Sequence, residues 1–129
     1  MSQEDKELLL KDLSARLTYG VKIQVKEWTT LDTELKVGHI NRLQNDDIEL
    51  KPYLRSMSSM TEEEKVEYYN TMDKETQRNY PNSCDFSESV YYSNTIKTFD
   101  WLNAHHFDYR GLIEKGLALE APEGMYNDD

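Results

Sequence analysis

The sequence lacks the features that mark several large classes of protein. Its apolar runs do not exceed three residues, as at Leu8 to Leu10, whereas a membrane-spanning helix needs about 20. Five glycines and three prolines in 129 residues are too few for a collagen-like chain. No basic start is followed by an apolar stretch of signal-peptide length. These absences exclude a transmembrane protein and a collagen, and we expect a cytoplasmic protein.

Cysteine is almost absent as well. Cys84 is the only one, so no intrachain disulfide can form, which excludes a secreted disulfide scaffold and fits a reducing compartment. The acidic neighbours Asp85 and Glu88 oppose the thiolate that a nucleophilic Cys84 would need. The sequence has no Gly-rich phosphate loop, no CxxC pair, no GxSxG and no HExxH. We therefore expect no enzymatic activity, no catalytic residue, no cofactor and no bound metal.

Positive charge is scarce and unevenly distributed. The net charge is −10, from 15 Lys and Arg against 25 Asp and Glu. Residues 1–60 hold nine basic and ten acidic side chains, whereas residues 61–129 hold six basic and fifteen acidic ones. A negative surface repels phosphate, which argues against non-specific nucleic-acid binding and against anionic membranes. The acidic second half is expected either to keep the protein soluble or to form a face that recognises a basic partner or imitates DNA.

The first half of the chain changes from helical to strand spacing. Leu10, Leu13 and Leu17 recur at helical intervals, so residues 1–19 are expected to form a helix that starts at Ser2 and stops at Gly20. Strand-like alternation then follows in three short stretches, at 21–25, at 33–37 with a bend at Gly38, and at 48–50 before Pro52. Residues 20–56 are therefore expected to form a small antiparallel sheet of SH3-like curl, a partial barrel. A fourth strand is expected from 53–55 or from the C-terminal tail.

The second half is expected to be mainly helical. Thr61 and Glu64 form a capping box, which predicts a helix over 61–80 with Val66, Tyr69 and Met72 as its buried stripe. Residues 82–94 are ambiguous between a short strand and the lead-in to the next helix. A helical corner is expected over residues 95–117, and Asp108 is expected to cap its last short helix. Residues 118–129 are expected to form a fraying tail. Together the patterns predict one α+β domain over 1–129 with helices at both ends of a small sheet.

Three groups of side chains are candidates for a functional site. The first is the acidic start of the helix at 61–80, proposed to bind a protein partner through Glu62, Glu63, Glu64 and Glu67. The second is a polar cluster that either packs a corner or, as an alternative, performs acid–base chemistry: His105, His106, Asp108, Tyr109 and Arg110. The third is a basic strip on the polar strand faces, the usual footprint of a nucleic-acid reader: Lys22, Lys26, Lys36, Arg42, Lys51 and Arg55.

Long strings of the sequence resemble known proteins. The strings are ELLLKDLSARL at 7–17, KPYLRSMSSMTEEE at 51–64 and HFDYRGLIEKGLA at 106–118. They are similar to a set of uncharacterised small proteins of gut Bacteroidales and their phages or mobile elements. The resemblance implies a bacterial or phage intracellular setting and carries no activity across. We expect a non-enzymatic interaction protein whose acidic helical half contacts a protein partner. A nucleic-acid-binding barrel is the alternative, and an enzyme that uses His105, His106 and Asp108 comes third.

Overall fold

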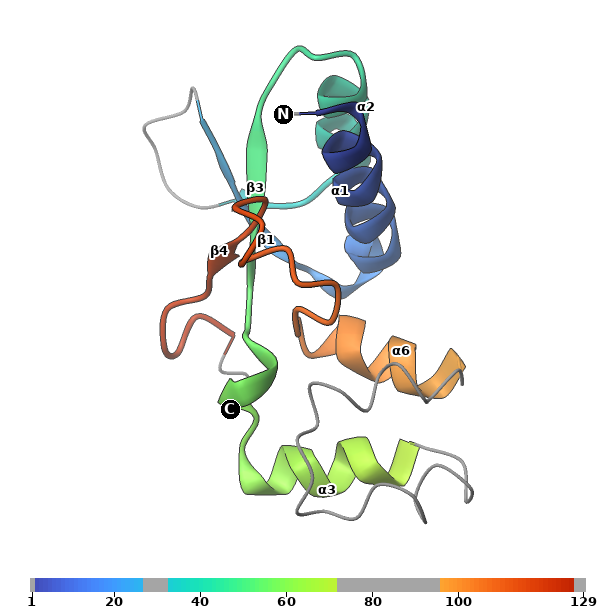
Figure 1. Ribbon diagram of the computed structural model, residues 1–129, viewed down its shortest axis with the longest axis vertical. Helices are drawn as coiled ribbons and strands as arrows, with labels where there is room; N and C mark the ends of the chain where they lie inside the picture. Colours follow the sequence, from blue (N-terminus) through green and yellow to red (C-terminus); the bar gives the residue numbers. More distant parts are fainter. Residues whose placement is uncertain (1, 27–32, 72–95, 127–129) are drawn as a thin grey trace.

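The computed structural model describes residues 2–26, 33–71 and 96–126, so Cys84 and the segment 82–94 lie outside the described residues. In this part of the chain, helices α1 and α2 lie beside the sheet. Helices α3 and α6 lie together near the C-terminal end of strand β3 (Figure 1). None of the helices in the described ranges is both long enough and apolar enough to cross a membrane. The α+β class expected from the sequence is confirmed.

Helix α1 (Gln3–Arg16) forms as its sequence predicts. The Ser2 hydroxyl accepts a hydrogen bond from the backbone N–H of Asp5 at 3.1 Å and so caps the first turn. A 3-10 turn (Leu17–Tyr19) and then Gly20, at φ 73°, end the helix. Leu9 and Leu13 are fully buried, and each side chain stabilises the fold by about 1.5–3 kcal/mol. This face of α1 covers the sheet.

The sheet has four strands in the order β2-β1-β3-β4: β1 (Lys22–Val25), β2 (Thr33–Glu34), β3 (Leu50–Leu54) and β4 (Leu119–Glu120). Strand β1 pairs antiparallel with both β2 and β3, but β4 pairs parallel with β3. The expectation of a purely antiparallel sheet was therefore wrong. The sheet is mixed and does not close on itself, and an SH3-like curl is not confirmed.

The strand predicted over 33–37 is much shorter in the structure. Strand β2 ends at Glu34, and helix α2 (Val37–Gln44) starts where the strand and a bend at Gly38 were expected. Two interactions explain the change. His39 Nδ1 accepts the backbone N–H of Lys36 at 2.9 Å and starts the helix, while Leu43 is buried against α1. The alternation over the five residues 33–37 was outweighed at its C-terminal end by a helical face that packs on α1.

The third strand extends beyond the predicted stop at Pro52. Strand β3 runs from Leu50 to Leu54, and Pro52 lies opposite Ile23 of β1. The backbone N–H of Lys26 donates to Glu49, so the alternating ladder turns the main-chain groups of Pro52 away from β1. The missing N–H of proline therefore removes no bond to β1, and the strand continues.

Helices α3 (Glu62–Thr71) and α6 (Ile96–Ala104) are the α-helices of the second half within the described residues. Residues 72–80 of the helix predicted over 61–80 lie outside the described residues. The last helix of the predicted corner is absent from the described residues 105–117, which form turns because His106, Gly111 and Gly116 have positive φ angles. The tail does not fray up to Tyr126: β4 pairs with β3, and the Tyr126 hydroxyl donates to the backbone of Tyr53 at 2.7 Å.

Two apolar clusters form the core. The first joins α1, α2 and the sheet and includes Leu9, Ile23 and Leu54. The second joins α3, α6 and the chain after α6 and is made of Met57, Met60, Tyr68, Leu102 and Phe107. A buried ion pair of α1, Arg16 with Asp12, reaches towards the second cluster, because Arg16 Nη2 donates to the Phe107 carbonyl at 2.6 Å.

Candidate functional site

Helix α3 is fixed to the rest of the protein by one face. The Thr61 hydroxyl accepts the backbone N–H of Glu64 at 3.1 Å, and the Glu64 carboxylate accepts that of Thr61 at 2.9 Å, so the predicted capping box is present. Arg55, which follows β3, donates two hydrogen bonds to Glu64, at 2.7 and 2.6 Å. Tyr68 is fully buried and stacks on Trp101 of α6.

The anchoring interactions also change the electrostatics of Glu64. Burial raises the pKa of Glu64, but the hydrogen bonds from Arg55 and Thr61 and the charge of Arg55 outweigh it, so its pKa lies below the usual value. The Arg55 guanidinium in turn lies 4.2 Å from the centre of the Phe107 ring. Glu64, one of the four predicted partner-binding residues, therefore holds the helix in place rather than facing solvent.

The opposite face of α3 is exposed and carries the other three predicted glutamates. We call Glu62, Glu63, Val66 and Glu67 the acidic face; all four are exposed. Glu62 pairs with Lys65 at 3.2 Å, and Glu67 accepts a long hydrogen bond of 3.5 Å from the Trp101 indole. Within the described residues, Glu63 forms no ion pair.

Val66 is the residue of this face whose predicted position was wrong. We expected it in the buried stripe, but it is 51% exposed, while Tyr68 and Thr71 are buried instead. The spacing of Glu64, Tyr68 and Thr71 is itself helical, so treating the capping glutamate as part of the inward face would have found this orientation. Of the other predicted stripe residues, Tyr69 is partly buried and Met72 lies outside the described residues.

The predicted polar cluster at 105–110 makes contacts in several directions. The His105 ring stacks on Trp101 with ring centres 4.1 Å apart, whereas the His106 ring stacks on Tyr126 at 3.8 Å. The Asp108 carboxylate accepts the backbone N–H groups of Leu112 and Ile113 at 2.9 and 3.0 Å. The predicted capping role of Asp108 is thus present, although it closes a turn rather than a helix.

The other two members of this cluster contact the buried ion pair of α1. Arg110 Nε donates to the Asp12 carboxylate at 3.1 Å, and the Tyr109 hydroxyl donates to the side chain of Asn103 at 2.9 Å. The Arg16 and Arg110 guanidinium groups lie 5.2 and 5.0 Å from the centre of the Tyr109 ring. These contacts join α1 to the chain after α6, so the cluster has a structural role in the fold.

The predicted basic strip is partly neutralised. Lys26 pairs with Glu49 and Lys36 with Glu34, both at 3.0 Å, and Arg55 pairs with Glu64. The Lys22 amine donates to the backbone carbonyl of Met125 at 3.2 Å. A strip in which three of six cations face a carboxylate attracts phosphate less strongly than its sequence suggests.

Neither the described residues nor the comparisons with other proteins add a metal site or a matching protein to these surfaces. In the described ranges, no three His, Cys, Asp or Glu side chains are grouped so that they could hold a metal ion. A scan against models of protein families finds no match, and neither curated proteins nor solved structures contain a significant match to this chain.

Proposed function

We propose that this protein is a non-enzymatic binding protein whose acidic face contacts a basic protein partner. The observation that supports the proposal most directly is Val66, which is half exposed among Glu62, Glu63 and Glu67. An apolar centre with a charged rim is the arrangement of a protein-binding surface. The partner would present Lys or Arg side chains around a small apolar depression.

The attachment of α3 supports this role. A bidentate pair between Arg55 and Glu64 and the buried ring of Tyr68 fix the helix, so little conformational entropy is lost when its outer face binds. The net charge of −10 would attract a basic partner over a distance and speed up its association at low ionic strength.

The proposal is tested with a photo-reactive amino acid in place of Val66, in the cells that encode the protein. We expect a cross-linked partner with a basic surface, and we expect the cross-link to disappear in the double variant Glu63→Lys, Glu67→Lys. The matched control is Glu123→Lys, which reverses the charge of an exposed glutamate in the turns after β4. It should leave the cross-link unchanged. A cross-link that persists in the double variant contradicts the proposal.

The nucleic-acid alternative is separated by a gel-shift measurement over a range of salt concentrations. Binding through the lysines of β1 and β3 would weaken steeply as salt rises, and Lys51→Glu would weaken it further. The proposed function predicts no retardation of DNA or RNA at physiological salt. Retardation that depends on Lys51 would favour the alternative.

A further inference from the structure

One edge of β3 is only half paired. In the described residues, β4 pairs with Tyr53 and Leu54 and leaves the first half of β3 without a neighbour on that side. The bond from the Lys26 N–H to the Glu49 carbonyl fixes the alternation of the ladder with β1. It follows that the N–H and C=O groups of Leu50 point away from β1, towards this open edge. Such an edge is a template for an added strand.

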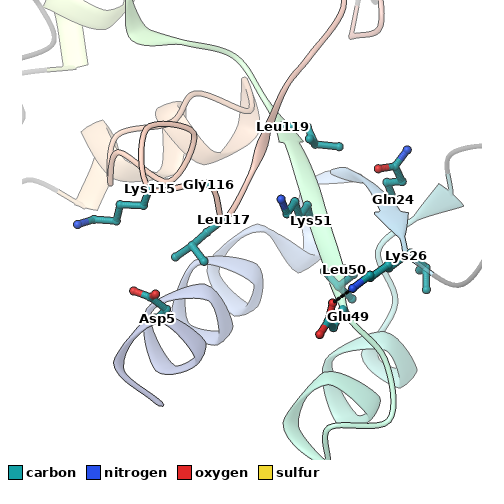
Figure 2. Close-up of a pocket in the computed structure, with 11 residues that line it drawn as sticks. Asp5, Gln24, Lys26, Glu49, Leu50, Lys51, Lys115, Gly116, Leu117 and Leu119 are labelled. Carbon is teal, nitrogen blue, oxygen red and sulfur yellow. Dashed lines mark ion pairs between the residues drawn. The ribbon is translucent and has the colours of Figure 1, made fainter. Parts of the chain in front are cut away.

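A hollow of ≈ 620 Å³ borders the open edge and extends across β3 as far as Gln24 and Lys26. Figure 2 shows β3 with Leu50 and Lys51 on one side and the loop 115–117 on the other, with Asp5 of α1 below the loop. Its volume is in the range of about 300–1,000 Å³ that ligand sites occupy. Strands rise about 3.3 Å per residue, so three or four residues of an extended segment would cover the edge from Glu49 to Pro52.

The two faces of the sheet differ in chemistry beside this edge. Leu50 is turned to the core, next to the buried Leu117 of the loop, so an added strand meets an apolar surface on that face. Lys51 is exposed on the other face, opposite Gln24 of β1. The hydrogen bond from the neighbouring Lys26 lowers the pKa of Glu49 most, and the charge of Lys51 lowers it further. Lys51 itself forms no ion pair among the described residues.

We propose that this hollow binds an extended segment of a partner protein, which adds to β3 as a strand in line with β4. The segment carries an apolar side chain towards Leu117 and an Asp or Glu beside Lys51, because side chains alternate across a strand and opposite charges attract on one face. Its main chain bonds to the N–H and C=O groups of Leu50. This surface is separate from the acidic face, so an experiment can contradict one proposal and leave the other intact.

The test is a selection of random ten-residue peptides displayed on phage against the full-length protein, followed by affinity measurements on the selected peptides as synthetic probes. We expect enrichment of sequences that alternate apolar and acidic residues. We expect Lys51→Glu to weaken their affinity about fivefold or more, since it replaces attraction with repulsion. The matched control is Lys97→Glu, which reverses an exposed lysine on α6 and should leave the affinity unchanged.

Strand pairing is tested separately from charge. Two versions of a selected peptide carry N-methyl groups on alternate residues, one on the odd and one on the even positions. Both keep their side chains, but only one loses the N–H groups that face β3, and that version should lose binding entirely. Slower hydrogen exchange of the Leu50 amide with the unmodified peptide should accompany binding. The proposal is overturned if no peptide is enriched, if Lys51→Glu has no effect, or if both methylated registers bind as well as the parent. It is also overturned if native mass spectrometry shows a dimer that the selected peptide dissociates, because the edge then binds a second copy of the chain.

Discussion

The buried carboxylate of Asp12 provides the sharpest test of how the two halves of the fold are joined. Asp12 and Arg16 are both fully buried, and the carboxylate accepts hydrogen bonds from Arg16 Nε at 2.8 Å and from Arg110 Nε at 3.1 Å. Replacing Asp12 with leucine leaves the Arg16 charge buried without a counter-ion. Breaking a buried pair in this way costs about 3–5 kcal/mol of unfolding free energy, because the remaining charge stays desolvated.

Because the cost comes from the unpaired Arg16 charge, removing that charge as well should restore part of the lost stability. The double variant Asp12→Leu, Arg16→Met removes both buried charges, so it should be more stable than Asp12→Leu alone although it carries one more substitution. The Phe107 carbonyl then loses the donor at 2.6 Å, which keeps the double variant below the wild type by about 1–3 kcal/mol.

Urea unfolding followed by circular dichroism measures these differences. For a chain of 129 residues, the single variant should also lower the melting temperature by about 10–20 °C. Lys11→Leu is the matched control, because it replaces the exposed neighbour on the same helix and should change stability by less than about 0.5 kcal/mol. The reasoning is refuted if Asp12→Leu costs less than about 1 kcal/mol, or if the double variant costs the sum of the two single ones.

Three further predictions test other parts of the fold. The lowered pKa of Glu64 means that its stabilisation is present above the ordinary value of 4.5 and is lost as pH falls through the lower folded value. Glu64→Gln should therefore flatten the loss of stability as pH falls below 4.5, measured by urea unfolding. Gly20→Ala should cost about 1–2 kcal/mol, since φ is 73°, whereas Gly38→Ala in α2 should be neutral or stabilising in thermal melts. Tyr126→Phe removes a hydroxyl that bonds to β1 and β3, so amides of β4 should exchange hydrogen faster.

The contacts within a few residues of the chain could be predicted from the order of its residues. The cap at Ser2 and the capping box of Thr61 and Glu64 join groups three positions apart, and the stop at Gly20 depends on the φ angle of one residue. The alternation in β1 was sufficient for the same reason, because period-two spacing already separates a buried from an exposed face. The choice of the acidic segment as the candidate surface likewise followed from local charge.

Which way that surface faces depended on contacts across the chain. Arg55 draws Glu64 inward, and this turns Val66 to solvent against the expected stripe. Pro52 lies inside a strand because its main-chain groups point away from β1, so that no bond to β1 is lost. Leu119 pairs in parallel with a strand more than sixty residues earlier. Periodicity reports only which side of one element is apolar. The partner that covers that side, and the edge left open beside Leu50, are decided when distant segments compete for the same buried area.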